Sequence, residues 1–259
     1  MIDLELHGLV GNASVRLDFV NYRQPASVLT HSVPNPLSVS RNSLAATTVG
    51  NFALFGGGFT AGGVSSAVVD AYDTALTRTT PTALSVARHV LAATTVGNFA
   101  LFGGGFTAGS VSSAVVDAYD TALTRTTPTA LSAARDNLAA TTVGNFALFG
   151  GGLTAGSVSS AVVDAYNTTL TRTNPTPLSS ARFGLAATTV GDFALFGGGT
   201  ALVDAYNGFF THCHFPLTTS STYDVGGGIM TAASNFTLQV VAPVNGWIRY
   251  RRGTLTGTV

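Results

Sequence analysis

The densest group of potential metal ligands in this sequence is His212-Cys213-His214. Imidazole nitrogens and a thiolate are the ligands that zinc and copper prefer, so three such residues in a row raise the question of a metal centre. On a strand, however, successive side chains point to opposite faces, so the two histidines lie on one face and Cys213 on the other. We therefore expect no metal site and no metal cofactor, and we expect these residues to end a half-buried strand.

Aspartate and arginine recur at equivalent places in every copy of an internal repeat. The residues are Asp70, Asp117, Asp164 and Asp204, and Arg41, Arg88, Arg135 and Arg182. An active site is normally unique, so a set repeated around the molecule favours a structural role in hydrogen bonds and ion pairs between neighbouring units. The sequence contains no nucleophile-elbow, phosphate-loop, zinc-protease or paired-carboxylate motif. No catalytic residue is predicted, and we expect a protein that is not an enzyme.

The repeat that positions these residues is clearest in Leu44–Gly58, LAATTVGNFALFGGG, which returns at Leu91, Leu138 and Leu185 with a period of 47 residues. LAATTV and FALF are strand-forming runs joined by a Gly-Asn hairpin turn, and AVVDAY and LTRT supply two more strands before a proline. Four short antiparallel strands per unit are typical of a propeller blade. The sequence therefore predicts an all-β fold, a β-propeller of about five four-stranded blades.

Both ends of the chain contain parts of the pattern. Residues 29–41 match residues 76–88, and LDFVNY at 17–22 is similar to the third strand of a unit. The stretch 230–241, MTAASNFTLQVV, loosely resembles the first two strands. We expect these N- and C-terminal strands to pair and close the ring, which would remove open sheet edges.

The predicted domain organisation has three parts. Residues 1–16 form an N-terminal arm, and residues 17–215 contain the repeats, of which the shortened fourth copy ends in a strand at 209–215. Residues 216–259 form a C-terminal β-rich segment that closes the ring, mediates assembly or does both. A separate C-terminal domain is the alternative.

The combination of FALFGG, a tyrosine after an apolar strand (VVDAY) and an arginine before the next unit (LSVAR) resembles the kelch repeat. The resemblance covers residues 17–206, but the tryptophan that a kelch unit carries after its tyrosine is absent, and the one tryptophan is Trp247. The resemblance implies a propeller of the kind seen in kelch-like proteins and in the central domain of galactose oxidase. Most kelch propellers are binding modules and a few are enzymes. A copper centre like that of galactose oxidase needs histidines, tyrosines and a tyrosine-linked cysteine that no motif here places.

Composition narrows the class of partner. Charged residues make up 9% of the 259 residues, the formal net charge is zero and lysine is absent, so we expect neither nucleic-acid binding nor a polybasic membrane patch. No run approaches the roughly 18 apolar residues of a membrane span, and the first residues do not resemble a signal peptide. Near-identical repeats and few charges favour a structural or recognition component of a phage virion or other extracellular assembly. The alternatives are a cytoplasmic protein-interaction scaffold and a carbohydrate oxidase or lyase, and homo-oligomerisation stays open.

Variation among the copies predicts which face is functional. In such a blade the linker between the second and third strands opens on the same side as the linker between units. The residues that follow the repeated arginine differ in every copy, and the linker after the glycines begins with phenylalanine or leucine. Loops that diverge on one side of a repeat protein are a common location of binding. We expect a glycan or a partner protein to bind this face through Phe59, His89, Phe106, Asp136 and Phe183.

Overall fold

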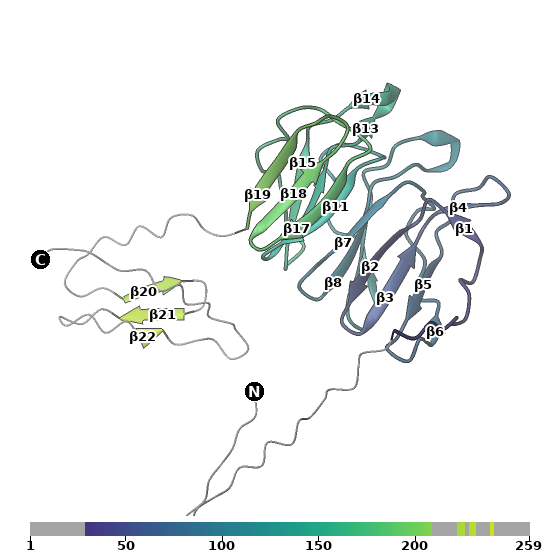
Figure 1. Cartoon of the computed structure of the whole chain (residues 1–259), viewed down its shortest axis with the longest axis horizontal. Coiled ribbons are helices and arrows are strands. Elements are labelled where there is room, and N and C mark those ends of the chain that lie inside the picture. Colours follow the sequence, from purple (N-terminus) through teal and green to yellow (C-terminus); the bar gives the residue numbers. More distant parts are fainter. Residues whose placement is uncertain (1–28, 209–221, 226–227, 232–238, 241–259) are drawn as a thin grey trace, which may run out of the picture. The chain divides into compact units, whose positions relative to one another are not determined.

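The computed structural model describes residues 29–208, 222–225, 228–231 and 239–240 (Figure 1). The chain divides into two compact units, Met1–Gly208 and Phe209–Val259. The described residues are almost entirely strands and turns, with two three-residue 3-10 turns, η1 (Ala108–Ser110) and η2 (Ala155–Ser157). Among them no helix has the length and apolar character needed to cross a membrane.

The repeats form four consecutive antiparallel sheets, here numbered sheets 1 to 4. Sheet 1 consists of β2 (Ala45–Val49), β3 (Phe52–Gly56), β5 (Val69–Tyr72) and β6 (Arg78–Thr79). Sheet 2 consists of β7 (Ala92–Val96), β8 (Phe99–Gly103), β9 (Val116–Tyr119) and β10 (Arg125–Thr126). Sheet 3 consists of β11 (Ala139–Val143), β12 (Phe146–Gly150), β15 (Val163–Asn167) and β16 (Arg172–Thr173). Sheet 4 consists of β17 (Ala186–Val190), β18 (Phe193–Gly197) and β19 (Val203–Asn207).

The prediction of an all-β fold with four strands per unit is confirmed for sheets 1 to 3. Within each sheet the strands pair in sequence order, and the Val49↔Phe52 register leaves Gly50 and Asn51 as a two-residue turn. Gly50 has φ +52°, a left-handed conformation that glycine adopts without strain. The expected fourth strand of the last copy, at 209–215, lies outside the described residues.

Neighbouring sheets pack face to face, with their first strands β2, β7, β11 and β17 next to one another (Figure 1). The ring of Phe102 lies on Gly56, where an added Cβ would come within 2.7 Å of it. Phe149 on Gly103 and Phe196 on Gly150 repeat this contact at 2.7 Å. The FALF strands are apolar at every position because each of the inner ones has a sheet on both sides.

Threonine hydroxyls join the first strands. Thr47 hydrogen-bonds Thr95 at 2.7 Å, and Thr94 hydrogen-bonds Thr142 at the same distance. Thr141 and Thr189 make the third such contact, at 2.9 Å. Because these contacts recur between each pair of sheets, the three sheet-to-sheet interfaces are close copies of one another.

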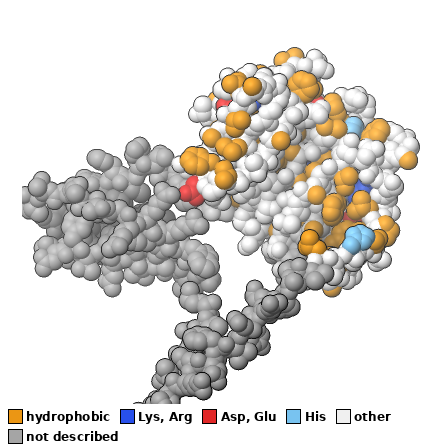
Figure 2. All heavy atoms as spheres, viewed as in Figure 1, with side chains coloured by type: hydrophobic (Ala, Val, Ile, Leu, Met, Phe, Trp, Pro, Cys, Tyr) orange, Lys and Arg blue, Asp and Glu red, His pale blue; other side chains and the backbone are white. Residues whose placement is uncertain are grey.

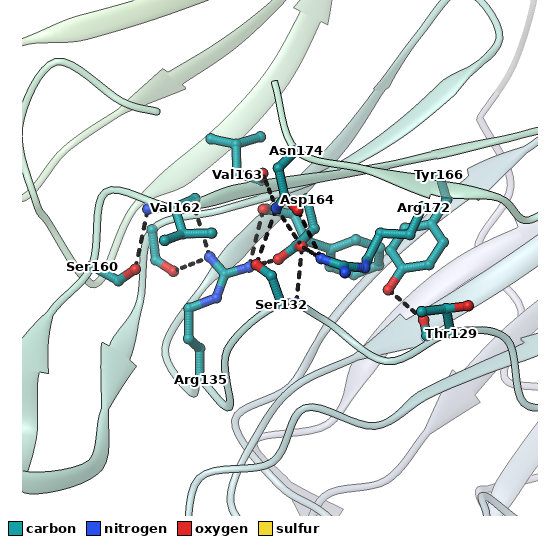
Figure 3. Close-up of polar contacts among 12 residues, drawn as sticks. Thr129, Ser132, Arg135, Ser160, Val162, Val163, Asp164, Tyr166, Arg172 and Asn174 are labelled. Carbon is teal, nitrogen blue, oxygen red and sulfur yellow. Dashed lines mark hydrogen bonds and ion pairs between the residues drawn. The ribbon is translucent and has the colours of Figure 1, made fainter. Parts of the chain in front are cut away.

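A buried ion pair joins each sheet to the segment that precedes it, and Figure 3 shows the pair of sheet 3. Arg135 donates to Asp164 and, at 2.7 Å each, to the carbonyl oxygens of Gly151 and Val162. Asp164 also accepts hydrogen bonds from Arg172 at 2.8 Å and from the Ser132 backbone N–H at 2.9 Å. The equivalent pairs are Arg41–Asp70, Arg88–Asp117 and Arg182–Asp204. The predicted ion pairs of the repeated arginines and aspartates are therefore present, and their structural role stays a prediction.

The second unit contains a three-stranded antiparallel sheet with the order β20 (Thr222–Val225), β21 (Gly228–Thr231) and β22 (Gln239–Val240). β21 pairs with β22 inside the stretch where the sequence predicts a strand pair, with Met230 opposite Val240. β20 lies in the segment 216–259 that the sequence predicts to be β-rich, although the sequence does not place a strand at 222–225. Residues 17–28 lie outside the described residues, so closure of a ring by the terminal strands stays a prediction, as does the arm at 1–16.

Candidate functional site

The glycines of each complete copy lead into a short hairpin beyond the sheet. In sheet 1, β4 (Phe59–Thr60) pairs with β1 (Arg41–Asn42), so Phe59 lies opposite Asn42. The same pairing places His89 opposite Phe106. In sheet 3, Asp136 lies opposite Leu153, where β13 (Leu153–Thr154) pairs with β14 (Val158–Ser159). The sequence varies at two places, after the repeated arginine and at the start of the linker that follows the glycines. The structure pairs the backbones of these two places.

We call this region the hairpin edge, and it comprises residues 42–43, 59–66, 89–90, 106–113, 136–137 and 153–160. Glycine is required where the hairpin leaves the sheet, because the two backbones run against each other. A Cβ on Gly105 would lie 2.6 Å from the carbonyl oxygen of His89, and one on Gly152 would lie 2.5 Å from that of Asp136. Both glycines also have positive φ values. The repeated GGG thus brings each variable residue close to the hairpin of its own sheet.

Three of the five predicted site residues form an aromatic row. The His89 ring is 4.6 Å from Phe59 and 5.6 Å from Phe106, measured between ring centroids, with interplanar angles of 43° and 37°. His89 Nδ1 lies 3.0 Å from the hydroxyl of Ser65. His89 therefore bridges the hairpins of sheets 1 and 2, and all three rings are part-exposed.

Partial burial lowers the pKa of His89 below its ordinary value of 6.5, and this desolvation outweighs the negative charge of Asp136 and a backbone hydrogen bond with Phe106, which raise it. The imidazole is therefore neutral at neutral pH. A neutral ring in contact with two phenylalanines presents an apolar surface that ends in one polar nitrogen.

Asp136 lines the next groove along the edge, between the hairpins of sheets 2 and 3. The groove encloses about 350 Å³, and its walls include Phe106, Val111, Leu153 and Ser157. Asp136 is 1% exposed and accepts hydrogen bonds from the Ser112 hydroxyl at 2.7 Å and from the Asn137 amide at 2.9 Å. The groove thus combines an aromatic wall with a carboxylate held in a fixed orientation.

Phe183 lies apart from the other four residues. Its side chain is 49% exposed, and the linker of sheet 4 is too short to form the hairpin that would pair with it. The structure therefore brings Phe59, His89 and Phe106 into contact and places Asp136 beside Phe106, but it gives Phe183 no contact with this group among the described residues.

Sequence reasoning missed Ser65 and Ser112, which hold His89 and Asp136. These serines recur in every complete copy, so a comparison of copies hides them. The signal that could reveal them is position. Each lies directly across its hairpin from the aromatic residue that begins it, as the Phe59↔Ser65 and Phe106↔Ser112 pairings show.

A second opening of about 340 Å³ lies where the four sheets come together at their first strands. Each sheet contributes an equivalent pair of residues, namely Ser43 and Leu44, Val90 and Leu91, Asn137 and Leu138, and Gly184 and Leu185. None of these side chains is an ionisable acid or base, so the lining contains no general acid or base. The described residues contain no group of three or more His, Cys, Asp or Glu that could hold a metal ion. His212-Cys213-His214 lies outside the described residues.

A scan against protein-family models and a search of curated proteins both found no match to this chain. The resemblance to kelch repeats therefore rests on the residues quoted from the sequence.

Proposed function

We propose that the repeats are successive blades of a kelch-like β-propeller and that the protein is a non-enzymatic recognition module. Its hairpin edge would bind a glycan or a partner protein within a phage virion or another extracellular assembly. The observation that carries the proposal is the pairing of variable residues. Positions that differ among otherwise near-identical copies lie opposite one another at a single edge.

The packing of the sheets supports the propeller arrangement. Propeller blades are four-stranded antiparallel sheets that pack face to face around the axis with their first strands innermost. Three sheets with four strands, a shared opening at their first strands and the repeated phenylalanine-on-glycine contact agree with this arrangement. The sequence predicts a ring completed by residues 17–22 and 230–241 of the same chain, and completion by a second copy of the chain is the alternative.

The chemistry of the edge supports recognition of an uncharged polar ligand. Phe59, His89 and Phe106 offer ring faces on which the C–H faces of a sugar or a tyrosine side chain can stack. Asp136 is 1% exposed and accepts hydrogen bonds from Ser112 and Asn137, so it fixes the orientation of the Ser112 hydroxyl in the groove wall. Polar groups in a fixed orientation beside aromatic surfaces are common in binding sites for small polar ligands.

The test is binding to a glycan array and to immobilised candidate proteins. We expect the variant H89A/F106A/D136N to lose at least about tenfold in affinity for whatever the native protein binds, which corresponds to about 1.4 kcal/mol. D136N keeps the size of the side chain and most of its hydrogen bonds, so the fold should survive, as circular dichroism can verify. The matched control is N51A/N98A/N145A, which alters exposed turn residues at the opposite ends of the same strands. Equal loss of binding in both variants, or in neither, would contradict the proposal.

A further inference from the structure

The three internal interfaces use the same two faces of each sheet. The face toward the following sheet, the trailing face, carries the glycine that receives a phenylalanine and two valines from the first and third strands. In sheet 3 these valines, Val143 and Val163, are 3% and 1% exposed. The face toward the preceding sheet, the leading face, carries the phenylalanine, and Phe102, Phe149 and Phe196 are all fully buried. Every interface thus joins one trailing face to one leading face.

Within residues 29–208, nothing covers the trailing face of sheet 4. Val190 and Val203 occupy the places of Val143 and Val163 but are 60% and 63% exposed, and Phe193 is 45% exposed. Gly197 should receive a phenylalanine ring, yet the one atom near its missing Cβ is a methyl of Val203 at 3.5 Å. Figure 2 shows hydrophobic side chains gathered over this sheet. Apolar patches of this kind usually mark an interaction site.

Sheet 1 has the complementary leading face, and no sheet precedes it within residues 29–208. Phe55 is only part-buried, whereas its three equivalents are fully buried. Thr48 is exposed, whereas its equivalent Thr95 hydrogen-bonds Thr47 of the sheet before it. Ala46 is exposed too. Within residues 29–208, sheets 1 and 4 therefore present the two unmatched halves of an interface that these residues form three times.

We propose that a second copy of this chain packs sheet 1 against the trailing face of sheet 4. Its Phe55 would enter the space over Gly197, and its Thr48 would meet Thr188, as the equivalent residues do in the internal interfaces. The charged side chains on the leading face of sheet 1 are paired with one another, since Asp70 contacts both Arg41 and Arg78. The association therefore brings no unpaired charge into a desolvated interface.

A second copy fits this face better than the chain's own C-terminal strand pair does. Aligning Asn235-Phe236 with Asn51-Phe52 puts Gln239 at the position of Phe55. A glutamine there would leave the space over Gly197 without its ring and would bring an amide into an apolar contact. The first sheet of a second copy supplies the residues LAATTVGNFALFGGG in full.

The contact joins unlike faces, so it produces a head-to-tail assembly, which either closes into a ring or extends. The full-length 26.3 kDa chain should therefore sediment at a multiple of its own mass at micromolar concentration and dissociate on dilution. V203D should raise the dissociation constant at least about tenfold because it places a charge in the contact. The matched control is V158D, because Val158 is 60% exposed on a hairpin rather than on this face.

A mixing experiment tests the polarity of the contact. F55Q removes the ring from the leading face and leaves the trailing face intact, whereas V203D does the reverse. Each variant alone should be monomeric, and an equimolar mixture should form a dimer through the one intact pair of faces. A wild-type chain that stays monomeric up to about 100 µM would overturn the proposal. If V203D then lowers the melting temperature of that monomer, the chain's own terminal strands cover the face. Equal weakening of the oligomer by V203D and by V158D would also overturn the proposal.

Discussion

Replacing Arg135 with alanine tests the structural role of the repeated ion pair. The Arg135 side chain is fully buried and donates to Asp164 and to the carbonyl oxygens of Gly151 and Val162. Removing it leaves both carbonyls and one carboxylate oxygen without this donor. Truncating one partner of a buried ion pair costs about 3 to 5 kcal/mol.

The low end of that range applies here, because Asp164 keeps three other donors. These are Arg172, the Ser132 backbone N–H and the Asn174 amide. Burial by itself raises the pKa of Asp164, but hydrogen bonds from Arg172 and Ser132 and the charge of Arg135 hold that pKa below its ordinary value. We therefore expect R135A to lower the free energy of unfolding by about 3 kcal/mol. For a domain of this size the melting temperature should fall by roughly 10 °C.

The assay is urea unfolding monitored by circular dichroism, with R182A as the matched control. Asp204, the partner of Arg182, is 15% exposed, so water can replace part of what the arginine provides. R182A should therefore cost less, about 1 to 2 kcal/mol. A free energy of unfolding for R135A within about 0.5 kcal/mol of that of the native protein, or a larger loss for R182A than for R135A, would refute this role of the ion pair.

Three further predictions concern backbone strain, packing and pH. Val90 has φ +52° where Asn137 stands in the next copy, so V90N should stabilise the fold by about 1 kcal/mol and N137V should do the opposite, as thermal unfolding can measure. G103A should cost about 1 to 3 kcal/mol, because its Cβ would lie 2.7 Å from a buried ring. The equivalent G197A should leave the stability of the dilute monomer unchanged, and equal effects would argue against the packing described. Because folding lowers the pKa of His89, the unfolded chain takes up this proton at a higher pH than the folded chain does. Stability should therefore fall as the pH drops below about 6.5. H89Q should remove that part of the pH dependence.

Much of the fold could be predicted from the sequence because each strand and turn pattern recurs in several copies of the repeat. The Gly-Asn turn at Gly50 and the all-apolar FALF run indicated hairpins buried on both faces, and the structure has both. The recurrence of Arg135 and Asp164 in every copy indicated a structural ion pair, which is present. β20 was expected only as part of a β-rich segment at 216–259, because TYDV belongs to no repeat that would fix the bounds of a strand.

The candidate site was predictable only in part. Divergence among copies located the edge, but it could not show which variable residues touch, because contact depends on the hairpins between them. Phe183 differs from its equivalents just as His89 does, yet the shortened linker of sheet 4 leaves it without a hairpin partner. The exposure of Val190 and Val203 could not be predicted from the repeat either, because their equivalents in the earlier copies are buried by the next sheet.

The central claim is that recognition takes place at the hairpin edge, and hydrogen–deuterium exchange tests it most directly. The full-length protein would be compared with and without the strongest ligand found on the glycan array or among the immobilised proteins. We predict slower exchange on binding in residues 59–66, 106–113 and 153–160. We predict no change at the Gly50-Asn51, Gly97-Asn98 and Gly144-Asn145 turns. Protection confined to those turns, or to Leu44, Leu91, Leu138 and Leu185 at the opening between the first strands, would contradict it.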